Sequence, residues 1–203
     1  MSNPRPHGPR YTVRDYLAWD DDRRYELIEG EAHLMAPAPT LQHQSITLGL
    51  AGQLRKCLQE KLRASSECPC QVYVAPVDVI LSPDTVVQPD VVLVCDPAKL
   101  ANGRNVHGAP DLAVEVLSPA TGRHDRLIKR DLYERVGVTH YWLADPEALT
   151  LECYRLLGGA YGKPAVYGPG DTVDLPYCGG LALDLTEVFG PPPAPGPRGP
   201  DLP

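Results

Sequence analysis

The chain has 203 residues, of which 43% are hydrophobic and 22% are charged, and this composition excludes a fully disordered chain. Its formal charge of −7 argues against a protein that coats nucleic acid non-specifically, although it allows a small basic groove on an acidic surface. The longest unbroken apolar run is only five residues, 91–95, so we expect no membrane-spanning helix.

We expect one folded domain, residues 11–190, between two tails. Residues 1–10 carry three prolines without apolar periodicity, which predicts a flexible N-terminus. Residues 191–203 carry seven prolines, which predicts a disordered, polyproline-like tail. Residues 1–24 lack the apolar segment of a secretory signal, so a cytoplasmic location is expected.

The first half of the domain predicts a strand pair and a long helix. Residues 25–35 are expected to form a strand pair, or one bent strand, that turns near Gly30. Residues 40–63 then place apolar side chains on one helical face, with Thr40 as the N-cap. Two further strands are expected over residues 71–81, with a kink or bulge near Pro76, and over residues 86–95.

The second half continues the alternation of strands and helices. Residues 111–117 predict a buried strand, and residues 123–136 predict a helix that ends at Gly137. Strands over residues 140–144 and 149–157 should follow. The fold class is therefore α/β or α+β, a mixed sheet flanked by helices.

The six cysteines favour neither disulfides nor zinc. Without a secretory signal, reduced thiols are the default and a disulfide framework is not expected. No C-x-x-C pair occurs, and only Cys68 and Cys70 are close together, so the usual ligand spacing of a structural zinc site is missing.

Two carboxylates stand out because they interrupt apolar strands. Asp90 and Glu115 are both flanked by valines, and a buried charge persists only when it is paired, hydrogen-bonded or bound to a metal. For either residue alone, a strand end or a basic partner is the commoner explanation. Two such residues on strands separated by one loop favour Mg²⁺, which prefers hard oxygen ligands.

Three further residues are candidates, each with a structural alternative. Lys129 borders the predicted apolar face of Ile128, Leu132 and Val136, but it could simply pair with Asp125 four residues away. His43 lies within the apolar stripe of the long helix, where a hydrogen-bonded core histidine is the commoner outcome. Glu26, within the first strand, is similarly ambiguous.

The ordered set of motifs resembles the Uma-two (Uma2) family of restriction-endonuclease-like proteins over about residues 11–189. The motifs are Tyr25-Glu26-Leu27-Ile28-Glu29-Gly30-Glu31, His43, Gln88-Pro89-Asp90-Val91, the segment from Ala109 to Pro119, Lys129, Tyr133, Gly137-Val138 and the segment from Tyr141 to Pro146. The resemblance implies the PD-(D/E)xK nuclease fold, in which a mixed sheet carries an acidic cluster that binds a divalent metal.

The resemblance also implies roles for individual residues. Asp90 and Glu115 match the two motif acids, and together with Val116 they form the expected metal site for Mg²⁺ or Mn²⁺. Leu117 stands where the generic motif has a lysine, and that lysine appears on the following helix as Lys129. His43 and Glu26 match recurrent family positions and complete the expected catalytic set.

The leading functional hypothesis is a Mg²⁺-dependent DNA endonuclease, with a homodimer expected because many proteins of this fold dimerise to cut both strands. Its rival is a non-catalytic nucleic-acid-binding or assembly protein on the same fold. The acidic net charge favours either this rival or a nuclease with a narrow substrate groove. Hydrolysis of another phosphodiester is a third hypothesis.

Overall fold

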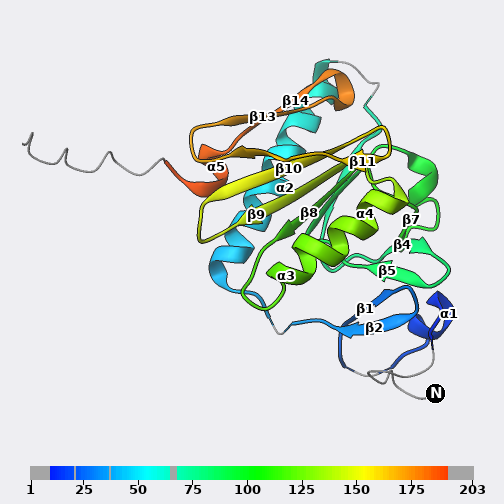
Figure 1. Cartoon of the computed structure of the whole chain (residues 1–203). Helices are drawn as coiled ribbons and strands as arrows, with labels where there is room; N and C mark the ends of the chain where they lie inside the picture. Colours follow the sequence, from blue (N-terminus) through cyan, green and yellow to red (C-terminus); the bar gives the residue numbers. More distant parts are fainter. Residues whose placement is uncertain (1–9, 21, 37, 65–67, 192–203) are drawn as a thin grey trace, which may run out of the picture.

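The structure is a computed structural model that describes residues 10–20, 22–36, 38–64 and 68–191. Except for Arg10 and Pro191, the two predicted tails lie outside these residues. The described residues form the predicted mixed α/β fold, with two larger sheets, one strand pair and flanking helices (Figure 1).

The main sheet has seven strands in the order β11-β10-β9-β8-β6-β3, with β12 also paired to β10. Its strands are β3 (Gln71–Val74), β6 (Val91–Val94), β8 (Leu112–Val116), β9 (His140–Asp145), β10 (Thr150–Leu157), β11 (Ala160–Tyr161) and β12 (Ala165–Tyr167). β8 and β9 are parallel, whereas β6 pairs antiparallel with β3 and with β8. β6 and β8 are buried along their whole length, as their continuous apolar runs predicted.

A second sheet has the order β2-β1-β5-β4-β7, and a separate pair joins β13 to β14. Their strands are β1 (Tyr25–Ile28), β2 (Glu31–Leu34), β4 (Val79–Ser82), β5 (Thr85–Val87), β7 (Val106–His107), β13 (Thr172–Leu175) and β14 (Leu181–Asp184). The predicted strand pair over residues 25–35 is confirmed. Glu29 and Gly30 both have positive φ, as a two-residue hairpin turn of type I′ requires.

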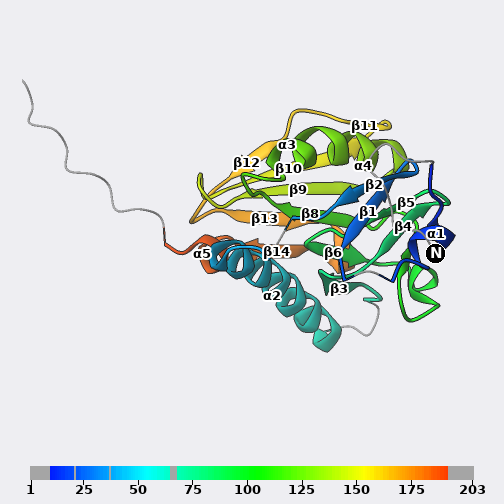
Figure 2. The same cartoon turned by 90° about the horizontal axis from the view of Figure 1, so that it is seen from below.

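Helices cover both faces of the main sheet, as Figure 2 shows from below. On one face lies α2 (Leu41–Ala64), beside the β13–β14 pair. On the other face lies a continuous helical segment made of α3 (Gly122–His124), the π-helical η2 (Asp125–Lys129) and α4 (Arg130–Val136). The short elements are α1 (Val13–Tyr16), η1 (Pro97–Leu100), η3 (Tyr177–Gly179) and α5 (Thr186–Phe189).

Each helical layer closes its own hydrophobic core against the sheet. Residues of α2 pack with Val91, Leu93 and Val114, and residues of α4 pack with Val92 and Ala113. Thr40 caps α2 as predicted, because its Oγ1 accepts the N–H of His43 at 3.2 Å. None of the helices in the described part of the chain is long and apolar enough to cross a membrane.

Each of the segments 71–81 and 86–95 forms two strands, one in each sheet. A break was predicted in the first segment, near Pro76, but not in the second, so the prediction of a single strand over residues 86–95 is wrong. The chain leaves the main sheet after β3, enters the second sheet as β4 and β5, and returns as β6. Pro89 has no N–H to donate to a ladder, and the N–H of Gln88 donates instead to Glu26 Oε1 at 2.8 Å. Both pieces are buried, and their sequence therefore reads as one continuous apolar strand.

The helix predicted over residues 123–136 exists, but the prediction that Ile128 lies on its buried face is wrong. Ile128 is 46% exposed, whereas Lys129 and Asp125 are buried. The cause is the π-helical turn Asp125–Lys129, which holds one residue more than an α-helical turn and rotates the later side chains around the axis. The helix ends as predicted at Gly137, whose φ is 86°.

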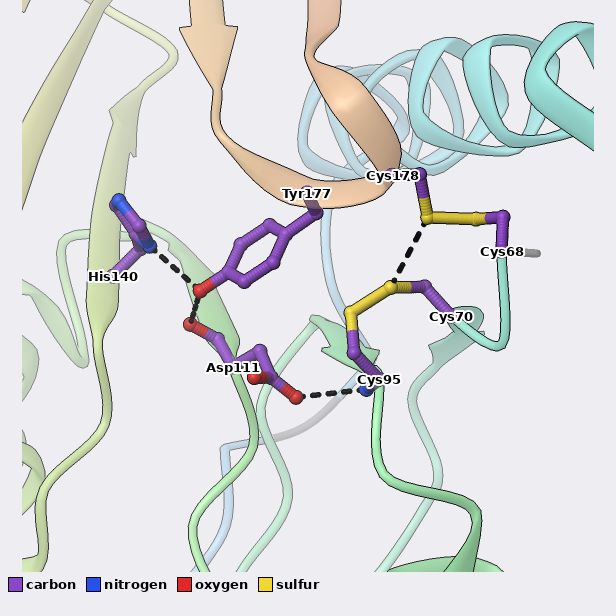
Figure 3. Close-up of a disulfide and its surroundings, with 7 residues drawn as sticks. All are labelled: Cys68, Cys70, Cys95, Asp111, His140, Tyr177 and Cys178. Atoms are coloured by element: carbon purple, nitrogen blue, oxygen red, sulfur yellow. Dashed lines mark hydrogen bonds between the residues drawn. A yellow bond between two sulfur atoms is a disulfide. The ribbon is translucent and has the colours of Figure 1, made fainter.

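The expectation that disulfides are absent is also wrong. Cys68 is bonded to Cys178, and Cys70 is bonded to Cys95 (Figure 3). These partners are 110 and 25 residues apart, so local spacing did not reveal them. They meet because the loop before β3, the residue after β6 and η3 converge at one end of the main sheet.

We predict that Gly30→Ala destabilises the fold more than Gly137→Ala. Both glycines have a left-handed φ, 80° and 86°, so each substitution should cost about 1–2 kcal/mol from the backbone alone. A Cβ at Gly30 would also lie 3.0 Å from the Cβ of Arg10, whereas a Cβ at Gly137 would meet no described atom within 4 Å. Urea unfolding of both variants measures the difference, and equal losses would contradict the close approach at Gly30.

Candidate functional site

Strand register brings the two predicted acids together on one face of the main sheet. Val91 is paired with Val114, and continuing this antiparallel register by one residue sets Asp90 opposite Glu115. Directly opposed residues project to the same face, with Cβ atoms about 4.5–5.5 Å apart. Glu115 projects to the face covered by α4, since Ala113 belongs to the α4 core, whereas Asp90, just outside β6, contacts His43 of α2.

Asp90 is held by one contact from the neighbouring strand β8 and one from the helix α2. Its Oδ2 accepts the N–H of Val116 at 2.8 Å and lies 3.3 Å from Nε2 of His43. The helix α2 supplies His43 from its first turn, where Nδ1 lies 3.5 Å from the hydroxyl of Thr47. The Asp90 carboxylate is therefore fixed in position at the start of β6.

Lys129 lies at the centre of the remaining acids. Its Nζ is 2.9 Å from Oε1 of Glu115 and 2.9 Å from Oε1 of Glu26. Asp125, one turn earlier on the same helix, lies 3.8 Å away. Lys129 therefore does lie near Asp125, as the alternative interpretation required. The two residues are buried, however, and Lys129 also contacts two more carboxylates.

Two groups near these acids were not among the predicted site residues. Tyr133, one turn after Lys129, donates its hydroxyl to Oε1 of Glu115 at 3.0 Å and is fully buried. Gln88 holds Glu26 through its backbone N–H. The i,i+4 spacing of Asp125, Lys129 and Tyr133 was the sequence signal that could have grouped them.

Burial shifts the protonation equilibria of this cluster strongly. Burial raises the pKa of Glu115 well above its usual range; Lys129 opposes the rise, while Asp125 and Asp90 add to it. Burial alone would lower the pKa of Lys129, but Glu115, Glu26 and Asp125 outweigh it and raise that pKa well above its ordinary value. Lys129 is therefore a permanent cation at neutral pH, surrounded by more acids than it can neutralise.

His43 is a second cation of the site under mildly acidic conditions. Burial disfavours its charged form, but the hydrogen bond and charge of Asp90 outweigh burial and raise the pKa of the imidazole above its usual value. Protonated His43 therefore stabilises the folded state. This contribution to the free energy of unfolding is complete below the unfolded-state pKa of about 6.5 and is lost as pH rises through the raised folded-state pKa.

The donor set fits a hard divalent cation that keeps part of its water shell. Asp90 and Glu115 offer carboxylate oxygens, and among the described residues none donates a hydrogen bond to Oδ1 of Asp90 or Oε2 of Glu115. In the same described residues, no three carboxylate or histidine ligand atoms cluster within 4.8 Å of one another, so a closed protein cage is not formed. Mg²⁺ is commonly bound in this manner, by one or two carboxylates and several waters.

We predict that Asp90→Asn lowers the pKa of His43. Without the carboxylate, burial acts on the imidazolium unopposed, so the pKa should fall below that in the wild-type protein. Titration of the His43 ring signals by NMR measures the change, with Asp145→Asn, far along the chain in β9, as a matched loss of one carboxylate. An unchanged pKa in Asp90→Asn would show that the His43–Asp90 contact is absent in solution.

The comparisons with known proteins agree with the fold and identify the family. A crystal structure titled as a putative nuclease belonging to DUF820 from Anabaena variabilis ATCC 29413 shares the fold, with a TM-score of 0.66 and 18% identity over 88% of this chain and 97% of that chain. No curated protein matches the sequence. The family model described as "Putative restriction endonuclease" matches residues 13–186, which is most of the chain. The chain therefore belongs to the Uma2 family, as its motifs predicted.

Proposed function

We propose that this protein is a Mg²⁺-dependent endonuclease that hydrolyses DNA phosphodiester bonds. The observation that carries the proposal is the buried Lys129 ammonium between Glu115 and Glu26 in a chain of this family. A lysine beside two motif acids on neighbouring strands is the arrangement that PD-(D/E)xK chemistry needs. The expected lysine migration from position 117 to 129 is consistent with the 2.9 Å contact to Glu115.

Asp90, Glu115 and Val116 would hold the metal. Val116 has no side-chain donor, so it could contribute only its backbone carbonyl. Bound there, Mg²⁺ would supply Lewis-acid polarisation of a phosphoryl oxygen and lower the pKa of a water molecule, and Mn²⁺ could replace it. The N–H of Val116 and the imidazole of His43 would keep Asp90 pointing toward that ion.

Lys129 would stabilise negative charge rather than accept a proton. Its pKa is raised well above the ordinary value, because Glu115, Glu26 and Asp125 outweigh the effect of burial. A general base must be deprotonated near the operating pH, and Lys129 is not. We assign it an electrostatic role toward the phosphoryl oxygens and the attacking water.

Glu26 and His43 would act through the groups that they contact. Glu26 fixes the position of Lys129 through the 2.9 Å contact, and Gln88 fixes Glu26 in turn. His43 would donate a hydrogen bond to a phosphate oxygen or to water when it is protonated. The expected homodimer stays a prediction, which sedimentation of the purified chain would test.

We predict that the protein nicks or linearises plasmid DNA when Mg²⁺ is present and that Asp90→Asn removes this activity by a factor of about 10² or more. The melting temperature of Asp90→Asn should be similar or higher, because the variant relieves repulsion among the carboxylates and its side-chain oxygen can still accept the Val116 N–H. Agarose-gel cleavage of plasmid and of single-stranded DNA, with and without a chelator, measures the activity.

Binding of DNA without cleavage would favour the non-catalytic nucleic-acid-binding or assembly role. Cleavage that persists in Asp90→Asn would remove Asp90 from the site. Cleavage of another phosphodiester but not of DNA would keep the site and change the substrate.

The variant Lys129→Met tests whether Lys129 takes part in cleavage, and Arg130→Met is the matched control. The first variant should cleave at least about 10²-fold more slowly, since one charge stabiliser is lost, while metal affinity changes much less. Arg130 is the next residue along the helix and pairs with Asp131 at the surface, so its variant should cleave at a near-normal rate.

Lys129→Met also leaves buried carboxylates without their cation and should destabilise the fold by about 3–5 kcal/mol. Rates are therefore compared at a temperature at which circular dichroism shows both variants folded. Equal rates for the folded Lys129→Met and Arg130→Met variants would exclude Lys129 from the chemistry.

A further inference from the structure

A cluster of four cysteines lies apart from the carboxylate site, and the proposed nuclease chemistry makes no use of it. The four are Cys68, Cys70, Cys95 and Cys178, which come from three separate segments of the chain. Figure 3 shows their sulfur atoms gathered between η3 and the residues next to β3 and β6. The two remaining cysteines, Cys57 and Cys153, are free.

The two disulfides are in contact with each other. Sγ of Cys70 lies 3.4 Å from Sγ of Cys178, and the sulfurs of Cys68, Cys70 and Cys178 all lie within 4.8 Å of one another. Two disulfides that only restrained the chain would not need to touch. The fourth sulfur, of Cys95, lies outside that group of three but is bonded to Cys70. Four sulfurs around a tetrahedral Zn²⁺, each about 2.3 Å from the metal, lie about 3.8 Å apart, and the 3.4 Å between Cys70 and Cys178 is close to that separation.

We propose that the reduced form of these four cysteines is a structural Zn²⁺ site. A dithiol reductant gives two electrons and two protons to each protein disulfide and is itself oxidised to a disulfide, which leaves four thiols. The four thiols then bind one Zn²⁺ as thiolates and release their four protons. The cluster would thus hold the same three segments together in both redox states, by two disulfides when oxidised and by one metal ion when reduced.

The surroundings suit a site that must hold its ligands in place. Cys68 and Cys70 are buried, and Cys95 donates its backbone N–H to Oδ2 of Asp111 at 2.7 Å. Tyr177, adjacent to Cys178, donates its hydroxyl to the carbonyl of Asp111 at 3.0 Å, so η3 and the end of β6 are tied to one residue. The ligand spacing expected of a zinc motif is missing because the tertiary fold, not one local segment, brings the sulfurs together.

Cobalt binding to the reduced full-length chain tests the proposal. The disulfides are reduced anaerobically with a water-soluble phosphine, because a dithiol would itself compete for the metal. The phosphine is converted to its oxide by an oxygen atom from water as each disulfide becomes two thiols. One equivalent of Co²⁺ should then give thiolate-to-cobalt charge transfer and the strong visible bands of tetrahedral cobalt, and Zn²⁺ should abolish them. The oxidised chain should give neither.

Variants locate the site. The double variant Cys57→Ser/Cys153→Ser keeps only the four clustered cysteines and should bind cobalt as the wild-type chain does. Asp90→Asn should also leave the thiolate spectrum unchanged, which separates this site from the carboxylate site. Cys178→Ser should weaken binding at least about tenfold, since loss of an outer-shell partner alone costs 10–100-fold.

The proposal fails if the reduced double variant shows no thiolate-to-cobalt charge transfer, and this result does not depend on whether Cys178→Ser folds. It also fails if folded Cys178→Ser binds cobalt as tightly as the double variant does. Neither outcome bears on DNA cleavage, so the zinc site and the nuclease can be refuted separately.

Discussion

The placement of the candidate site depends on one buried ammonium group. Lys129 Nζ contacts Glu115 on β8 of the main sheet and Glu26 on β1 of the second sheet, and Asp125 on its own helix is close by. Three carboxylates cannot stay ionised together in a poorly hydrated interior unless a cation lies among them. This one ion cluster therefore joins two sheets and a helix, and it makes their relative positions depend on a single charge.

The same region also explains why a strand is interrupted where the acids lie. If residues 86–95 formed one strand, Gln88 would give its N–H to a sheet ladder and could not hold Glu26. The change of sheet frees that N–H, and Pro89 next to it needs no partner. Asp90 then begins β6 with its carboxylate turned toward Val116 and His43. An arrangement that crowds three acids against one lysine is not one that stability alone would select.

A single short strand connects the two sites discussed above. Asp90 immediately precedes β6 and Cys95 immediately follows it, which separates them by about 17 Å of extended chain. β6 is buried on both faces and paired on both edges, by β3 and by β8. The sulfur cluster at its far end fixes η3, between β13 and β14, whereas Asp90 at its near end contacts His43 of α2.

The sequence by itself determined the fold class, most helix and strand positions, the family, and the five residues that the structure brings together. Local information was sufficient for the helices and strands, because apolar periodicity and caps act over a few residues. The family and the set of five residues came from the resemblance of the ordered motifs, since Lys129, His43 and Glu26 are each ambiguous alone. The division of residues 86–95 between two sheets, the π-helical turn that buries Lys129 and the pairing of the cysteines were decided only by the tertiary structure. Each depends on partners far away in the chain, such as Glu26 for the N–H of Gln88 or Cys178 for Cys68, and contacts of that range leave no trace in local spacing.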